Sequence, residues 1–237
     1  MKNLFLTTFI GDCPKDSLKI FEKYCEKYNL DLEVITDYKI NYYDLGFEKF
    51  RAIEMLEKYD RIVYVDGDVL ITPQAPNIFE AYPDPSFFYA FHESGYGPEN
   101  DRDALINLCM TELDKYFFFW PKEWNGKRRY FNSGVLLFSK EHAEALSKFS
   151  YYAPRLREFW GTDQTTLNCI VTFENVKYKN LPWDWNRGDL ASPDWNLMRY
   201  QGNFIHYSGR GYDFVDGIGK YNMLLKDMKF LYPEMNI

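Results

Sequence analysis

Residues 61–70 read RIVYVDGDVL, and this stretch decides the fold that the sequence predicts. Arg61–Val65 is nearly continuous in apolar residues, which is typical of a strand covered on both faces. Asp66-Gly67-Asp68 follows at once, so two carboxylates with one glycine between them come at the end of a buried strand. Carboxylate oxygens are the ligands that Mg²⁺ and Mn²⁺ prefer. The stretch therefore predicts a central strand that ends in a metal site.

The segments before this stretch alternate between strand and helix patterns. Leu4–Phe9 and Leu32–Ile35 predict buried strands, and a helix with apolar positions at helical spacing opens at Pro14. Phe47–Tyr59 predicts a second helix. The order βαβαβ predicts a parallel, twisted sheet with right-handed crossovers. The two carboxylates then lie at the carboxyl edge of its third strand, where open α/β sheets bind their ligands.

Residues 83–129 interrupt this alternation with four prolines, and the sequence predicts an insertion there that forms part of a substrate cleft or a lid. The remaining predicted strands are Tyr130–Phe138, Val176–Tyr178 and Phe204–Tyr207, and the remaining predicted helices are Asp103–Tyr116, Lys140–Phe149, Thr162–Thr172 and 219–230. The sequence contains no internal repeat, low-complexity run or linker. It is therefore read as one domain over residues 1–237.

Composition limits the classes of function. The formal net charge is −7 without a basic run, which gives no support for nucleic-acid binding through phosphates. No stretch approaches the roughly 18 apolar residues of a membrane span, and LFLTTFIGD near the start predicts a strand rather than a signal peptide. The four cysteines are scattered without a CxxC pair, which argues against structural zinc and disulfides and favours a cytoplasmic protein.

A strand followed by Asp-x-Asp occurs in more than one enzyme class. VYVDGDVLI resembles the first motif of haloacid-dehalogenase-type phosphatases, in which the first aspartate accepts the phosphoryl group. That motif normally ends the first strand of its domain, whereas this one ends the third predicted strand. No later Asp-Asp pair is found where that metal site needs one. A phosphatase stays open as the alternative enzyme.

Six segments in order resemble the glycosyltransferases of the GT-A fold, most closely family 8, which includes glycogenin and bacterial galactosyltransferases. They are LFLTTFIGD, FEKFRAIEMLEKYDRIVYVDGDVLI, YFNSGVLLFSK, GTDQTTLN, LPWDWN and FIHYSG, and they run from residue 4 to residue 209. Singly most are weak, but in this order they form a specific signal. The resemblance implies an α/β, Rossmann-like fold of the nucleotide-diphospho-sugar transferases, with a mostly parallel central sheet and helices on both faces.

The resemblance also implies a metal site. Asp66 and Asp68 would bind Mn²⁺ (or Mg²⁺) and, through the ion, the diphosphate of the donor. His206 would be the third protein ligand, through a neutral imidazole nitrogen. It is one of only three histidines in the chain, and it lies in a short strand-like run. The other two, His92 and His142, match nothing in the family and are predicted to be structural.

Three further polar residues match positions near the reacting sugar. Asn132 would hydrogen-bond the donor sugar. Asp163 and Gln164 would lie beside the reacting carbon, where Asp163 would bind sugar hydroxyls or stabilise an oxocarbenium-like centre. A carboxylate in the first turn of a helix also stabilises that helix, and the two roles of Asp163 are compatible.

The resemblance also implies residues that contact the nucleotide and the phosphates of the donor. Thr7 and Thr8 would line the nucleotide pocket, and Lys49 aligns with a basic residue that helps to hold the donor. An ordinary solvated lysine is the alternative for Lys49, and Arg51 is the alternative donor ligand if the alignment shifts.

The sequence departs from the family in its last matching segment. Family members usually continue His-x-x-Gly-x-x-Lys, and that lysine contacts the diphosphate. Here HYSGRGYD keeps Gly209 but has Tyr212 at the lysine position. Arg210 lies nearby and is expected to supply the cation as a bidentate fork.

Together these residues predict a metal-dependent glycosyltransferase that moves a sugar from a nucleotide-sugar, with UDP-sugars expected, to an acceptor hydroxyl. Family 8 members retain the anomeric configuration, so retention is expected. The acceptor would be a glycan, a lipid-linked molecule or a protein, and its choice is expected to depend on residues 95–129. A catalytically silent module that only binds nucleotide-sugars stays open beside the phosphatase.

Overall fold

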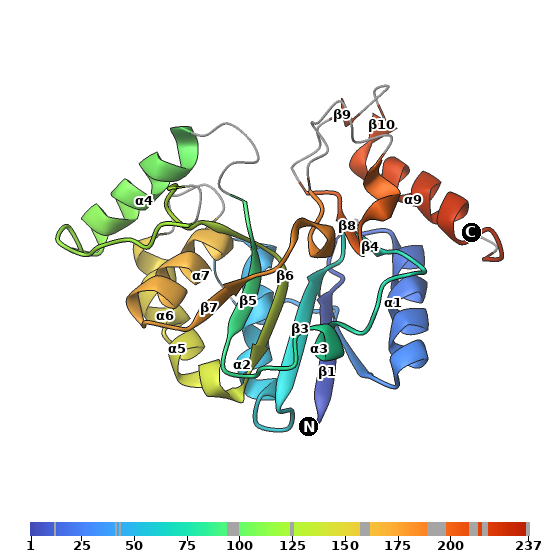
Figure 1. The fold of residues 1–237 in the computed structure, drawn as a ribbon, viewed down its shortest axis with the longest axis horizontal. Helices are drawn as coiled ribbons and strands as arrows, with labels where there is room; N and C mark the ends of the chain where they lie inside the picture. Colours follow the sequence, from blue (N-terminus) through green and yellow to red (C-terminus); the bar gives the residue numbers. More distant parts are fainter. Residues whose placement is uncertain are drawn as a thin grey trace.

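The computed structural model describes residues 1–11, 13–40, 42, 44–93, 100–123, 126–156, 162–188, 198–208, 213–214 and 218–235. A six-stranded sheet with the order β2-β1-β3-β6-β5-β7 forms its centre (Figure 1). These strands are β1 (Asn3–Thr8), β2 (Asp31–Ile35), β3 (Arg61–Asp66), β5 (Phe88–His92), β6 (Phe131–Ser139) and β7 (Tyr178–Asn180). Two short ladders join β4 (Val69–Ile71) to β8 (Phe204–His206), and β9 (Asp213–Phe214) to β10 (Ile218–Gly219).

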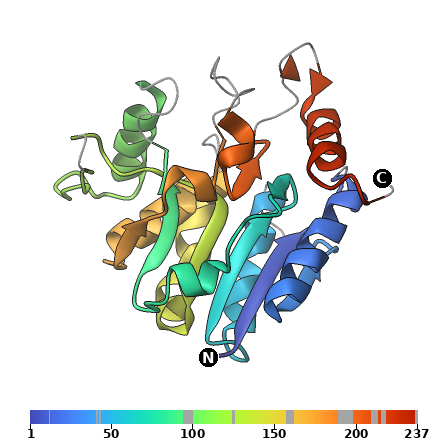
Figure 2. The same cartoon turned by 45° about the vertical axis from the view of Figure 1, so that its right-hand side comes forward.

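Helices cover both faces of the sheet, as predicted (Figure 1). One face carries α1 (Lys15–Tyr28) and α9 (Lys220–Leu231), which Figure 2 shows beside each other. The other face carries the 3₁₀ segment η1 (Leu45–Arg51), α2 (Ala52–Met55), α5 (Ala143–Ser147) and α7 (Thr162–Phe173). The remaining helical segments are α3 (Ile78–Ala81), α4 (Asn100–Glu112), α6 (Phe149–Tyr152), η2 (Lys140–His142), η3 (Ala153–Arg155), η4 (Trp183–Trp185) and η5 (Arg199–Gln201).

The first three strands of the chain are parallel to one another. β1 pairs in parallel with both β2 and β3, which is the arrangement that the βαβαβ order predicts. Successive side chains of a strand point to opposite faces, so Leu4 and Leu6 pack into one core and Phe5 into the other. A strand buried on both faces needs an unbroken apolar run, which explains the pattern of residues 61–65.

Of the six strands, β6 alone runs against the others. It is antiparallel to β3 on one side and to β5 on the other, while β5 and β7 are parallel. The sheet is therefore mostly parallel, as predicted. Because β6 is reversed, its first residues meet the carboxyl ends of its neighbours: Val135 pairs with Val65, so Asn132 and Ser133 lie next to Asp66 at the same edge.

The ladder between β4 and β8 brings a distant part of the chain to this edge. β4 begins directly after the two carboxylates, and Val69 pairs with His206 of β8. The backbone amide of Tyr207 also donates to the carbonyl oxygen of Asp68, at 3.0 Å. This pairing sets His206 beside Asp68 although the two are far apart in the sequence.

Two sequence-based predictions need correction. The segment expected as an insertion around 83–129 contains β5, a fully buried strand of the central sheet, so the departure from the sheet comes after His92. Pro83 and Pro85 precede that strand and do not interrupt it, which is where strands tolerate proline. The helix expected over Phe47–Tyr59 is divided between the 3₁₀ segment η1 and the short helix α2. η1 is opened by Asp44, whose side chain accepts the amide of Gly46.

Two further observations concern the cysteines and the helices of the described part of the chain. All four cysteines are unpaired. Within that part, every helix is too short or too polar to cross a bilayer. The strand predicted at the start of the chain is β1.

Candidate functional site

A cavity of about 330 Å³ opens at the carboxyl edge of β1 and β3, where Figure 1 places β8 near the start of α9. Its size falls in the range of small-molecule sites. Its polar lining comes from seven segments of the chain and includes Thr8, Lys49, Tyr64, Asp66, Asp68, Asn132, Asp163, Gln164, His206 and Lys220. Nearly all of the predicted site residues that the structure describes therefore meet in one cavity.

Asp66, Asp68 and His206 form a group that fits a divalent cation. One ligand atom from each lies within 4.8 Å of the others, and His206 Nε2 is 3.3 Å from Asp68 Oδ1 and 3.9 Å from Asp66 Oδ2. Two carboxylates and an imidazole suit Mn²⁺ or Mg²⁺. Gly67 is needed between them for a local reason: a Cβ there would lie 2.7 Å from the carbonyl oxygen of Thr8.

The charges of these three side chains are strongly linked. Burial raises the pKa of Asp66 above its usual value, with Asp68 adding to the rise and Lys49 opposing it. Burial acts in the same direction on Asp68, but His206 and Lys220 outweigh it and hold the pKa of Asp68 well below its usual range. Burial alone lowers the pKa of His206, yet the carboxylate of Asp68 more than compensates and raises it. Without an ion, His206 and Lys220 are thus the cations that Asp68 attracts.

Lys220, the first residue of α9, reaches into the cavity. Its Nζ lies 2.9 Å from Asp68 Oδ2. Sequence reasoning did not select this lysine, because it follows Asp68 by 152 residues and matches no motif. The position of its ammonium group shows that a positive charge is favoured beside the carboxylate of Asp68.

Lys49 is a buried residue of the cavity lining and is not an ordinary solvated lysine. Its three N–H donors have three partners within hydrogen-bond distance: Asp163 Oδ2 at 2.6 Å, and the carbonyl and hydroxyl oxygens of Ser133 at 3.1 and 3.0 Å. Asp66 Oδ1 is 3.6 Å away. Burial lowers the pKa of Lys49, but the two aspartates outweigh it and raise that pKa, so the ammonium stays charged.

Asp163 is the partner that this lysine holds. It lies in the first turn of α7, and its Oδ2 also accepts the hydroxyl of Ser133 at 3.0 Å. Burial raises its pKa, but Lys49 and these hydrogen bonds lower it below the usual value. Asp163 is therefore a fixed negative charge in the cavity at neutral pH, and both of its predicted roles fit this place.

The side chains of the two threonines at the end of β1 lie on opposite faces of the strand. Thr8 lines the cavity, and its Oγ1 is 3.2 Å from the hydroxyl of Tyr64, which in turn donates to Asp66 Oδ1 at 2.7 Å. Thr7 is also predicted to line the pocket, but it is not among the residues that line the cavity. Its side chain is fully buried and points to the opposite face of β1, because adjacent residues of a strand alternate.

Asn132 and Gln164 also line the cavity, and their amide side chains belong to a hydrogen-bonded chain. Asn132 Nδ2 donates to Glu93 Oε2 at 3.0 Å and to Gln164 Oε1 at 3.3 Å. Asn132 Oδ1 accepts from the amide of Gly134 at 2.8 Å and from Asn186 Nδ2 at 2.9 Å. All four hydrogen-bonding positions of this amide are therefore in use. Asn186 belongs to the LPWDWN segment, but sequence reasoning gave that residue no role.

The remaining candidates lie elsewhere. Arg51, the alternative to Lys49, pairs with Asp37 at 2.8 Å and with Glu48 at 3.4 Å, outside the cavity. The predicted contacts of Gly209 and Arg210, and the tyrosine at the family's lysine position (Tyr212), lie outside the described residues.

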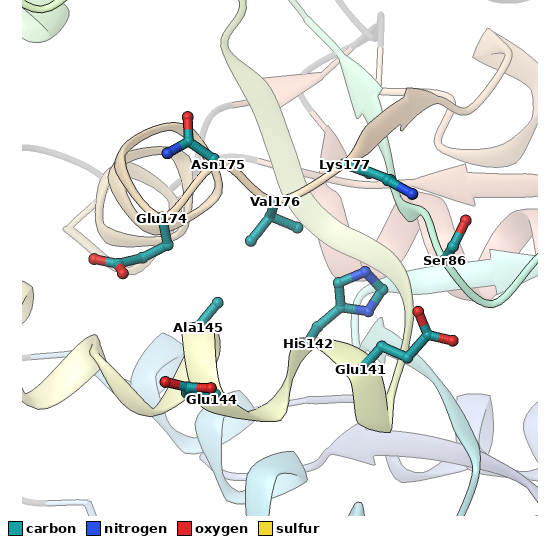
Figure 3. Close-up of a pocket in the computed structure, with 9 residues that line it drawn as sticks. All are labelled: Ser86, Glu141, His142, Glu144, Ala145, Glu174, Asn175, Val176 and Lys177. Atoms are coloured by element: carbon teal, nitrogen blue, oxygen red, sulfur yellow. The ribbon is translucent and has the colours of Figure 1, made fainter.

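The histidines that were predicted to be structural have structural partners. His92 Nδ1 accepts the backbone amide of Tyr130, and His142 Nδ1 accepts that of Ser139 as part of a capping box. His142 also borders a second hollow, which Figure 3 shows with Glu141, Glu144, Glu174 and Lys177 around it. None of the site residues predicted from the sequence lies there.

Comparison with known proteins agrees with this geometry. The model of the family described as "Glycosyl transferase family 8" matches residues 7–211. Galactinol synthase 1 of Solanum lycopersicum is 28% identical over 159 residues, a match that covers 65% of this chain and 43% of that protein. The chain thus spans less than half the length of this curated relative.

Solved structures share the fold at low identity. A glycosyltransferase involved in the glycosylation of the major capsid of PBCV-1 superposes with a TM-score of 0.60 at 14% identity, covering 89% of this chain and 96% of that one. The galactosyltransferase LgtC, solved with donor and acceptor sugar analogs, gives 0.58 at 13% identity, covering 99% and 96%. The glycosyltransferase GlyE of Streptococcus pneumoniae TIGR4 gives 0.57 at 14% identity, covering 95% and 59%. These likenesses establish the GT-A architecture.

Proposed function

Because the chain belongs to glycosyltransferase family 8, we propose that it transfers a sugar from a nucleotide-sugar to an acceptor hydroxyl with the help of a divalent cation. We infer a UDP-sugar as donor and retention of the anomeric configuration, in line with the family resemblance. The single observation that carries the proposal is the cavity that joins Asp66, Asp68 and His206 to the buried pair of Lys49 and Asp163.

Asp66, Asp68 and His206 are the residues that would hold the ion. Bound there, a divalent cation would supply positive charge to the diphosphate as it leaves. The three ligands come from β3, from the turn after it and from β8, which the β4–β8 ladder holds in register. Preformed ligands need little rearrangement, and preorganised charge is the largest single contribution in many enzymes.

Lys220 is proposed to contact the departing diphosphate. Its ammonium now lies against Asp68, and an ion on that carboxylate would compete with it directly. A displaced ammonium on the same cavity wall is suited to phosphate oxygens, which lysine binds as a point charge. Lys220 would then supply the charge that the family usually takes from the lysine of its last motif.

Asp163 and Lys49 would serve the sugar side of the reaction. The charged carboxylate of Asp163 is positioned to bind sugar hydroxyls or to stabilise positive charge at the reacting carbon. Lys49, whose donors are occupied, holds Asp163 in place. Asn132 and Gln164, which are bonded to each other, would shape the sugar-binding wall, with Asn132 acting through its neighbours because its own amide is saturated.

The test is a screen of UDP-, GDP- and dTDP-sugars with Mn²⁺, followed by product analysis. Asp68→Ala should abolish metal-dependent transfer while leaving the far-ultraviolet circular dichroism unchanged. Asp16→Ala, on the exposed part of α1, is the matched control and should keep full activity. Lys220→Met should weaken UDP binding by calorimetry. Full transfer by Asp68→Ala would contradict the proposal.

The same screen separates the alternatives. A phosphatase would release inorganic phosphate from phosphate esters and leave nucleotide-sugars intact. A silent binding module would be stabilised by Mn²⁺ with UDP but would turn over no donor. The family match, and the position of the carboxylates on the third strand, favour transfer over phosphate release.

A further inference from the structure

His206 has two ring nitrogens, and the structure gives each a different neighbour. Nε2 faces the carboxylates of Asp66 and Asp68. Nδ1 lies 2.9 Å from the side-chain oxygen of Asn186, which is itself fully buried. An amide oxygen only accepts, so this contact requires a proton on Nδ1. A ring that carries its proton on Nδ1 has its lone pair on Nε2, where a metal would bind.

The orientation of the Asn186 amide follows from neighbouring groups that can only donate or only accept a hydrogen bond. The backbone amide of Gly134 can only donate, so Asn132 must present Oδ1 to it. The carboxylate of Glu93 can only accept from an amide, so Asn132 must present Nδ2 to it. With Asn132 thus oriented, Asn186 must turn its Nδ2 toward Asn132 Oδ1. Its own oxygen is left for His206.

Sterics restrict the same ring. Gly134 lies under His206, so that a Cβ at this position would be 2.2 Å from Cε1 and 2.6 Å from Nδ1 of the imidazole. The backbone amide of His206 donates to the carbonyl of Arg187 at 2.8 Å, which holds the segment of Asn186 beside β8. The ring is therefore confined between Gly134 and Asn186, with one edge open toward the carboxylates.

We propose that Asn186 is the positioning residue of the metal site, because it accepts the Nδ1–H of His206 and presents Nε2 to the ion. This inference rests on the proposed metal site of the glycosyltransferase. Partners of this kind behind ligating histidines typically change metal affinity by about 10–100-fold when they are removed.

The first measurement is Mn²⁺ affinity by calorimetry for the wild type, Asn186→Leu and Asn186→Asp. The leucine variant, similar in volume but without an acceptor, should bind Mn²⁺ about 10–100-fold more weakly. The aspartate variant keeps an oxygen for Nδ1–H and should bind more tightly than the leucine variant. Asn222→Leu, at an exposed position of α9, is the matched control and should bind as the wild type does.

The second measurement follows the Nδ1–H proton by ¹⁵N-edited NMR, and the chain has only three histidines to assign. In the metal-free wild type at neutral pH, the His206 Nδ1–H signal should be protected from exchange with water. It should persist in Asn186→Asp and disappear in Asn186→Leu. Because no ion is present, this readout holds even if the proposed function fails.

Three results would overturn the inference: unchanged Mn²⁺ affinity in Asn186→Leu, an aspartate variant as weak as the leucine variant, or no protected Nδ1–H in the wild type. If Asn186→Leu does not fold, the wild-type signal and the aspartate variant still decide. A wild type that binds no Mn²⁺ would instead contradict the proposed function.

Discussion

His206 lies among two carboxylates and an amide oxygen, and its protonation state therefore decides whether the site can accept an ion. Burial lowers the pKa of His206, but the neighbouring carboxylates outweigh burial and raise that pKa above its ordinary value, so a proton on Nε2 is held more firmly than on a free imidazole. An ion must displace that proton, because only the neutral imidazole nitrogen is a ligand. The negative charge of the two aspartates thus attracts both the metal ion and the proton that competes with it for Nε2.

Metal affinity should consequently depend on pH. As the pH rises through the raised pKa of His206, the proton leaves and Mn²⁺ should bind more tightly, until affinity levels off above that pKa. Below it, binding should weaken and release close to one proton per ion. Calorimetry in buffers of different ionisation enthalpy measures both quantities. A pH-independent affinity between pH 6 and pH 9 would contradict the assignment of His206 as a ligand.

Gly134 should tolerate no side chain. Gly134→Ala would place a Cβ 2.2 Å from the imidazole of His206, and overpacking of this kind costs about 1–3 kcal/mol of unfolding free energy. It should also displace the ring and weaken Mn²⁺ binding. Urea denaturation and calorimetry measure the two effects. Gly219→Ala, where a Cβ would meet nothing within 4 Å, is the control, and equal behaviour of the two variants would refute the argument.

Much of the site could be predicted at the level of single residues. The residues found in the cavity as predicted are Thr8, Lys49, Asp66, Asp68, Asn132, Asp163, Gln164 and His206. Tyr64, Asn186 and Lys220 were not selected, because their roles arise only when separate segments meet. Thr7 was selected with Thr8 but does not line the cavity, because adjacent residues of a strand face opposite sides of the sheet.

The elements that build the site are held together by a buried ion pair behind it. Arg199 of η5 donates from Nε and Nη2 to the two carboxylate oxygens of Asp227 in α9, at 2.8 and 2.9 Å. Tyr207, next to His206, donates to the same carboxylate at 2.7 Å. This network joins the helix that carries Lys220 to the strand that carries His206, so both cationic groups keep their places relative to Asp68.

Removing one partner should therefore be costly. Asp227→Leu removes a fully buried carboxylate that accepts hydrogen bonds from Arg199 and Tyr207, and breaking a buried ion pair in this way costs about 3–5 kcal/mol of unfolding free energy. Asp16→Leu on the exposed part of α1 is the control and should change stability by less than about 0.5 kcal/mol. Urea denaturation compares them. A loss for Asp227→Leu as small as that of the control would mean that the pair does not anchor α9.

Elements were predictable where the pattern was local. The βαβαβ unit has uniform strands and short connections, and it was found as predicted. β5 was missed because prolines stand just before it, and η1 was expected as an α-helix because its apolar spacing suits either helix. The sequence of β6 does not reveal that the strand is antiparallel to its neighbours, because strand direction depends on how the preceding connection returns the chain to the sheet.

The whole molecule places two apolar cores around one sheet, and one edge of that sheet carries a cluster of charged side chains. Three aspartates there face the cationic groups of Lys49, Lys220 and, when protonated, His206. Charges buried without partners destabilise a fold, so this edge is stable only while positive and negative groups balance. An added divalent cation changes that balance and should be visible in global stability.

Mn²⁺ should accordingly stabilise the folded chain. At a concentration 100 times its dissociation constant, a ligand that binds only the folded state adds about 2.7 kcal/mol, which corresponds to a Tm rise of about 5–11 °C for a chain of this size. Asp68→Ala should show no rise. Differential scanning calorimetry with and without Mn²⁺ measures it, and an equal rise in both proteins would place the ion elsewhere.

The ladder between β4 and β8 also has a consequence for synthesis. The two carboxylates leave the ribosome early, but their partner strand, the amide that orients His206 and the lysine of α9 follow only much later, Lys220 coming 152 residues after Asp68. Chains fold from the N-terminal part first during translation, and contacts between distant segments form slowly. A nascent chain stopped before Phe204 would therefore lack His206 and Lys220, and it should gain the full metal site only once these residues have joined the sheet edge.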